Sequence, residues 1–128
     1  MKSKFSTAWK SSIRPRKQRK YVYNAPLHLR AGQLHVHLSK ELRQKYGVRA
    51  LRVRVGDTVK VSRGTHKGKE GKVERIEMKR CRVIVDKVEV KKLQGGVAKY
   101  PLQPSNLLLT GLAHDKRRFP VKKEEKKQ

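Results

Sequence analysis

The chain has 128 residues, with 35 Lys and Arg against 10 Asp and Glu, so its formal net charge is +25 and its pI is near 10.9. Self-repulsion at this charge density predicts a neutralising partner: first nucleic acid, then an anionic membrane surface or an acidic protein. No apolar run approaches the ~18 residues that span a bilayer, so membrane insertion is not expected, and the single cysteine, Cys81, excludes an internal disulfide.

Residues 1–23 form a basic segment without an acidic residue. Phe5, Trp9 and Ile13 recur every four residues, which is typical of one stripe of a short helix. Pro15 and the like charges around it oppose a helix that continues. We therefore expect an extended arm that becomes ordered on its partner, with a helical turn before Pro15. A solvated terminus without a binding role is the alternative.

Residues 24–50 carry helical signals. Asn24 is a suitable capping side chain for a first short helix. Ser39 is a good N-cap for a second helix over residues 40–46, and Gly47 is a natural C-terminal stop. Because such short helices are unstable alone in water, we expect them to pack on the rest of the protein or on its partner.

Residues 51–113 have a β pattern, and residues 114–128 form a tail of mixed charge that we expect to be disordered. The segment Gln94-Gly95-Gly96 predicts a hairpin turn, and residues 106–112 supply a last strand. Five or six short strands in this length predict a mainly β fold, a small closed or nearly closed barrel. Valines that alternate with polar residues mark the strands: Val53 and Val55, Val59 and Val61, Val83 and Val85, and Val88 and Val90.

The segment from Arg63 to Lys72 is the strongest candidate site. It joins two valine strands and combines glycines with closely spaced cations. It is not a phosphate-binding P-loop, because Gly-Lys-Ser/Thr is absent and no helix is predicted to begin there. Glycines that only shape a turn, with lysines that only add solubility, are the alternative. That alternative does not explain why four cations gather in one turn, so we favour contact with RNA.

Metal-dependent or enzymatic chemistry is not indicated. His35 and His37 would point to one side of a strand, but no third and fourth ligand is evident, so neither zinc nor another cofactor is expected. Asp57 is interpreted as capping the turn before a strand. No nucleophile with a base, and no pair of carboxylates, suggests catalysis.

Several segments together resemble a known family. Gly56-Asp57-Thr58-Val59-Lys60-Val61, Gly64, Lys67-Gly68 and Gly71-Lys72-Val73 resemble the KOW motif of ribosomal proteins and transcription elongation factors. The more specific similarity lies in the flanks, and from about Arg14 to Arg118 the chain is similar to the large-subunit ribosomal protein family universally numbered twenty-four (eukaryotic twenty-six). The two residues between Gly68 and Gly71 favour its archaeal form. The flanking segments are Arg16-Lys17-Gln18-Arg19-Lys20, Asn24-Ala25-Pro26-Leu27-His28-Leu29-Arg30, Leu38-Ser39-Lys40-Glu41-Leu42-Arg43-Gln44-Lys45-Tyr46 and Gln103-Pro104-Ser105-Asn106.

The resemblance implies an SH3-like (KOW) barrel in a monomer within the large ribosomal subunit, in the cytoplasm. It implies binding to the 5′ domain of large-subunit ribosomal RNA near the peptide exit tunnel, neighbouring ribosomal proteins as partners, and an early role in subunit assembly. A KOW-type transcription elongation module is the alternative. The candidate RNA-binding residues are Arg14, Arg16, Lys17, Arg19, Lys20, Arg30, Arg63, Gly64, His66, Lys67, Gly68, Lys69, Gly71, Lys72, Arg117 and Arg118.

Overall fold

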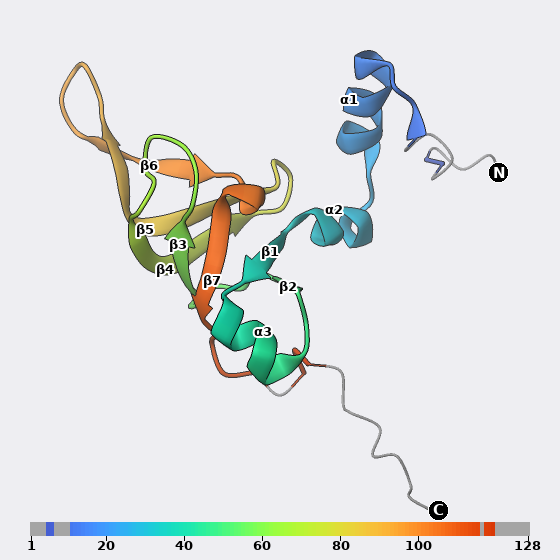
Figure 1. The fold of residues 1–128 in the computed structure, drawn as a ribbon. Coiled ribbons are helices and arrows are strands. Elements are labelled where there is room, and N and C mark those ends of the chain that lie inside the picture. The colour runs from blue at the N-terminus through green and yellow to red at the C-terminus, as the bar shows by residue number, and fades with distance from the viewer. Residues whose placement is uncertain (1–4, 7–10, 116, 120–128) are drawn as a thin grey trace, which may run out of the picture.

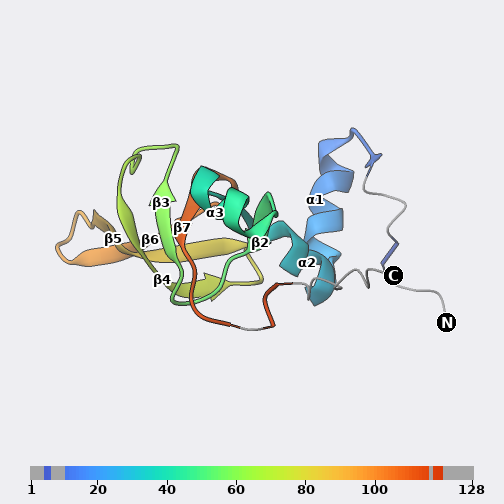
Figure 2. The same cartoon turned by 60° about the horizontal axis from the view of Figure 1, so that its bottom comes forward.

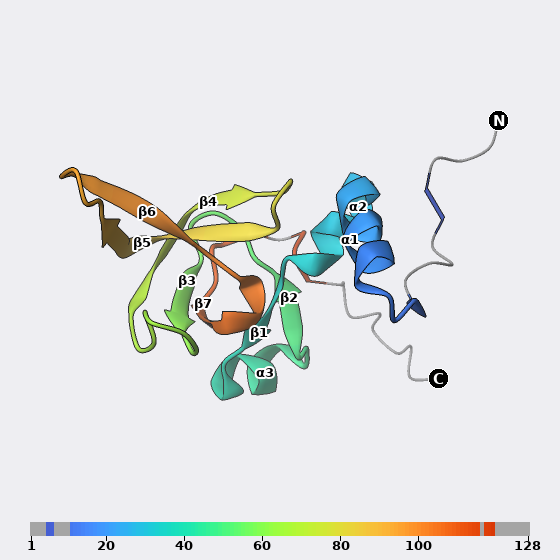
Figure 3. The same ribbon diagram turned by 90° about the horizontal axis from the view of Figure 1, so that it is seen from above.

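The computed structural model describes residues 5–6, 11–115 and 117–119, which form a β-rich body with helices at one end (Figure 1). Helices α1 (Pro15–Asn24) and α2 (Leu27–Gln33) lie at the end opposite the hairpin formed by β5 (Arg82–Lys91) and β6 (Val97–Leu102). Figures 2 and 3 show the same separation. No helix in these residues is long and apolar enough to cross a membrane.

The helix α1 corrects the expectation of an extended arm. It begins at Pro15, where the sequence analysis expected a helical turn to end. A proline is tolerated in the first turn of a helix because its missing N–H would have no intrahelical partner there. The apolar stripe expected before Pro15 includes Trp9, which lies outside the described residues.

The segment 24–50 contains a strand as well as helices. Asn24 is the last residue of α1 and does not cap α2, which follows Pro26. Strand β1 (His35–Leu38) then enters the sheet. The predicted second helix is confirmed as α3 (Lys40–Tyr46), with the Ser39 hydroxyl accepting the Leu42 N–H at 3.4 Å and Gly47 ending it at φ 66°.

The strands form one sheet in the order β2-β1-β7-β3-β4-β5-β6. Neighbouring strands are antiparallel except β1 and β7, which are parallel. The mainly β fold is confirmed. The two edge strands of the sheet, β2 and β6, do not pair with each other among the described residues, so the sheet does not close into a barrel. The remaining elements are β2 (Ala50–Arg52), β3 (Thr58–Val61), β4 (Glu70–Glu77), β7 (Leu107–Gly111) and the 3₁₀ helix η2 (Pro104–Asn106).

One apolar core is shared by the two halves of the sheet, which meet at β4. Strand β4 pairs with β3 through its first residues and with β5 through its last ones, so it passes from one half of the sheet to the other. Val55 and Val90 were expected to share the buried face, but they are 59% and 42% exposed. Val55 follows the end of β2, and Val90 lies beyond the bulge after Ile84, so neither faces the core. The buried cluster is Leu34, Val36, Leu38, Leu51, Val53, Val59, Val61, Val73, Val83, Val85, Val88, Leu102, Leu107 and Leu109.

The described residues after β7 pack on the body, contrary to the expected disorder beyond residue 113. The Phe119 ring stacks on Tyr46 of α3 with a centroid distance of 4.2 Å and an interplanar angle of 9°. Arg118 forms a double hydrogen bond with the buried carboxylate of Asp57, each at 2.6 Å. The basic run after residue 119 lies outside the described residues.

Asp57 is therefore more than a turn cap. Its carboxylate accepts hydrogen bonds from the backbone N–H groups of Arg54 at 2.8 Å and Ala113 at 2.9 Å, besides those from Arg118. Arg118 also donates to the Arg52 carbonyl at 2.9 Å. A buried charge is tolerated when it is paired and hydrogen-bonded. The network ties the start of β3 to the C-terminal segment.

Candidate nucleic-acid interface

The loop between β3 and β4 is held by its own backbone and presents its cations outward. The Gly68 N–H donates to the Val61 carbonyl at 2.8 Å, and the Lys67 N–H donates to the Gly64 carbonyl at 3.1 Å. Gly64 and Gly68 have φ angles of 93° and 89°, a region that residues with a Cβ rarely adopt. These turns leave Lys67 and Lys69 exposed while Val61 is buried.

The loop cations are electrostatically uncompensated. Among the residues that the structure describes, Arg63, Lys67, Lys69 and Lys72 form no ion pair. The acidic Glu70 beside them pairs with Lys60 at 3.3 Å instead. Unpaired cations on a fixed loop are arranged to attract a polyanion.

Three acidic side chains of strands β4 and β5 are gathered around one lysine of β6. Lys99 Nζ lies 2.8 Å from Glu74, 3.6 Å from Glu89 and 3.8 Å from Asp86. The hydrogen bond with Glu74 raises the pKa of Lys99, desolvation opposes it, and the charges of all three carboxylates add to it. Because the carboxylates outnumber the lysine, this cluster is unsuited to a phosphate backbone.

A second cationic surface is a groove of about 940 Å³ between α1 and the turn that joins β4 to β5. Arg30 spans it, donating to the Tyr23 carbonyl and to the Lys79 carbonyl at 3.3 Å. Among the residues that the structure describes, none that lines the groove is acidic, and its floor includes apolar side-chain surface. Its lining residues are Gln18, Arg19, Val22, Tyr23, Arg30, Lys79, Arg80 and Arg82.

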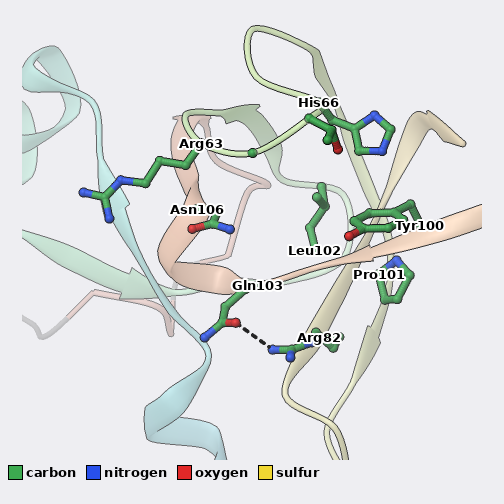
Figure 4. Close-up of a pocket in the computed structure, with 10 residues that line it drawn as sticks. Arg63, His66, Arg82, Tyr100, Pro101, Leu102, Gln103 and Asn106 are labelled. Atoms are coloured by element: carbon green, nitrogen blue, oxygen red, sulfur yellow. Dashed lines mark hydrogen bonds between the residues drawn. The ribbon is translucent and has the colours of Figure 1, made fainter.

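A smaller pocket, of about 170 Å³, lies between the loop and the end of β6 (Figure 4). The rings of His66 and Tyr100 meet at its rim, 4.9 Å apart and tilted by 55°. On another side, Arg82 donates to the Gln103 side chain at 3.1 Å. Arg82 lines both this pocket and the groove, so the two hollows share a wall.

The predicted RNA-binding residues fall into three groups. Arg19 and Arg30 line the groove, whereas Arg63, Gly64 and His66 line the pocket. Others lie on α1, on the loop, at the start of β4 or near the C-terminal segment. They are exposed, apart from Lys17 and Gly71, which are half-buried. These others are Arg14, Arg16, Lys17, Lys20, Lys67, Gly68, Lys69, Gly71, Lys72 and Arg117.

Arg118 departs from the prediction. Its side chain is only 3% exposed and is occupied by Asp57, so it is not available to RNA. The exposed neighbour Arg117 stays a candidate.

The structure adds functional candidates that the sequence analysis missed. Lys79, Arg80 and Arg82 reach the groove only because the β4–β5 turn folds toward α1. Tyr100 reaches His66 across the sheet. It is the single Phe, Tyr or Trp between positions 51 and 113, and its isolation among aliphatic strand residues was the available signal.

The histidines considered as metal ligands have other roles. His35 and His37 are exposed on one side of β1, as expected from their spacing. The His35 ring contacts the Gly32 carbonyl at 2.7 Å, and the His37 ring contacts Arg43 at 3.3 Å. In the described part of the chain, no group of three or more potential ligands could hold a metal ion.

The chain is similar to known ribosomal proteins over most of its length. A family model that describes the eukaryotic ribosomal proteins L26 and their archaeal counterparts matches residues 12–123. The "Large ribosomal subunit protein uL24" of Methanospirillum hungatei is 52% identical over 108 residues, which cover 84% of this chain and 90% of that protein. The protein of the same name from Methanocorpusculum labreanum is 51% identical over 102 residues, covering 80% and 84%. The chain therefore belongs to the ribosomal protein family that comprises eukaryotic L26 and archaeal uL24.

Proposed function

We propose that this protein binds large-subunit ribosomal RNA through two cationic surfaces, the loop Arg63–Lys72 and the groove beside α1. In the subunit it would contact the 5′ domain of that RNA near the peptide exit tunnel and act early in assembly, beside other ribosomal proteins. It is a non-enzymatic structural protein of the large subunit, as its family is.

The main observation behind the proposal is that one hairpin buries its valines and exposes its lysines. The valines of β3 and β4 are buried, whereas Lys67 and Lys69 between them are exposed and have no acidic partner among the described residues. Folded RNA presents phosphates and 2′-hydroxyls more readily than base edges, so a rigid cationic loop suits it. The alternative of a transcription elongation module has no comparable support, because the family match points to ribosomal proteins.

Binding to a transcript of the 5′ domain should depend steeply on salt. If about six to ten phosphates are neutralised, affinity should fall about a thousandfold or more between roughly 50 and 200 mM salt, because counterions are released on binding. Filter binding or anisotropy over this range measures the slope. A nearly flat dependence would refute the electrostatic account.

Replacing Lys67 and Lys69 together with alanine should weaken RNA binding without changing stability. Both side chains are exposed, so the free energy of unfolding should change by less than about 0.5 kcal/mol. Each lost phosphate contact should lower the salt slope by about one, so the slope should fall by about two. Melting curves and RNA titrations of the same preparation measure both effects.

The control is the double variant Lys40→Ala and Lys45→Ala, which removes the same charge from α3. It should bind RNA more tightly than the loop variant. Equal losses in the two variants would mean that net charge, not the loop, sets affinity.

A further inference from the structure

The pocket between the loop and β6 differs chemically from the cationic surface around it. Its walls contain two aromatic rings, the Leu102 side chain and two side-chain amides, those of Gln103 and Asn106. The Arg63 side chain extends away from Tyr100 in Figure 4, and Arg82 is bonded to Gln103. Cations therefore do not converge on the pocket as they would around a phosphate.

We propose that this pocket binds one unpaired nucleobase that is turned out of the RNA. The inference rests on the proposed binding of ribosomal RNA and adds a site of base recognition to it. Sequence-specific contacts to RNA are made mostly to unstacked bases in loops and bulges, which stack on aromatic side chains and bond through their edges.

The volume of the pocket fits a base without its sugar and phosphate. Its volume of about 170 Å³ is well above the roughly 10–15 Å³ that a single water needs. This is less than the roughly 300 Å³ at which pockets for drug-sized ligands begin. A flat heterocycle can enter, and its backbone would remain at the rim.

The aromatic rim offers a stacking surface. Tyr100 is 42% exposed, so one part of its ring is free of protein. The tilt of 55° between His66 and Tyr100 prevents both rings from lying parallel to the same base. We therefore assign stacking to Tyr100 and contact with the base edge to His66.

The side chain of Asn106 is available for a base edge. Unlike Gln103, which accepts from Arg82, the Asn106 amide forms no hydrogen bond with any residue in the described part of the chain. An amide supplies both donors and an acceptor, the combination that the edge of a base requires. The Asn106 backbone is fixed independently, because its carbonyl accepts the Ser62 N–H at 2.8 Å.

The surroundings supply a path for the RNA backbone. On one side, the pocket is lined by Gly64 and His66 of the loop that also carries Lys67 and Lys69. On the other side, Arg82 leads into the groove beside α1. A single strand that follows both cationic surfaces thus passes the mouth of the pocket.

The test uses the full-length protein and a transcript of the 5′ domain of archaeal large-subunit ribosomal RNA. Dimethyl sulfate and a carbodiimide probe the edges of unpaired bases, hydroxyl radicals probe the backbone, and titration gives the affinity. The variants are Tyr100→Ala, Tyr100→Phe and Asn106→Ala. Leu93→Ala is the control, because it truncates a large exposed side chain outside both the pocket and the groove. Melting curves verify that each variant is folded.

The wild-type protein should protect the edge of one unpaired base. Tyr100→Ala should abolish that protection and lower affinity about tenfold, as expected for a lost base–aromatic stack, whereas Tyr100→Phe should retain both. Asn106→Ala should abolish the protection with a smaller loss of affinity, and Leu93→Ala should leave both the protection and the affinity unchanged.

Two results would overturn the pocket proposal while leaving RNA binding intact. One is salt-dependent binding in which no base protection depends on Tyr100. The other is loss of backbone protection alone in Tyr100→Ala, which would indicate a phosphate contact. Failure of the wild-type protein to bind the transcript would instead refute the proposed function, and the pocket proposal with it.

Discussion

Arg118→Met should lower the free energy of unfolding by about 3–5 kcal/mol, because it leaves the Asp57 carboxylate buried without its cation. Asp57 has no exposed surface, and the Arg118 side chain is 3% exposed. The backbone N–H groups of Arg54 and Ala113 still reach the carboxylate, but they carry no full charge. Chemical denaturation at neutral pH measures the change.

The matched control is Arg117→Met, the same change at an exposed neighbour, which should alter stability by less than about 0.5 kcal/mol. Asp57→Asn combined with Arg118→Met should recover part of the loss, because no unpaired charge remains and the asparagine oxygen still accepts a backbone N–H. If Arg118→Met unfolds like the wild type, the ion pair does not hold the C-terminal segment in solution.

Gly71→Ala should destabilise the protein by about 2 kcal/mol, and Gly71→Val by more, because overpacking forces the backbone to move. A Cβ at Gly71 would lie 2.4 Å from the Asp86 carbonyl oxygen and 2.9 Å from a methyl group of Val85. Neither neighbour is the free end of a flexible side chain. Thermal melting with a two-state fit gives the difference.

The control for this substitution is Gly32→Ala, where a Cβ would meet no atom within 4 Å. Near the end of α2, alanine should be neutral or stabilising by up to about 1 kcal/mol. Equal melting temperatures for Gly71→Ala and Gly32→Ala would show that β4 and β5 separate at little cost, contrary to the close contact described above.

Local signals in the sequence predicted local structure well. The helix α3 was predicted from Ser39 and Gly47, since a cap and a left-handed stop act within one turn. Alternating valines predicted β3, because burial of one face of a strand repeats every second residue. Pro15 was misinterpreted because the same residue can end one helix or occupy the first turn of another.

Features that join distant parts of the chain had no such signal. Arg118 meets Asp57 across 61 positions and is one of 35 Lys and Arg, so nothing in its neighbourhood marked it as buried. The spacing of His35 and His37 suggested a strand, but its place in the sheet beside β7 was not predicted, because it is short and lies between two helices. The loop was predicted as a candidate site from its own residues. The pocket beside it also needs Tyr100 of β6, and predicting that contact would have required knowing how the strands pair.

The position of β7 in the sheet has a consequence for the order in which the chain can fold. Although it is synthesised after the other strands that the structure describes, β7 lies between β1 and β3, and Leu109 is the partner of both Leu38 and Val59. Contacts between such distant positions form slowly, because a long loop must close first. During synthesis, one edge of β1 and one edge of β3 therefore stay unpaired until residues 107–111 leave the ribosome. The high positive charge of the nascent chain opposes its self-association over that interval.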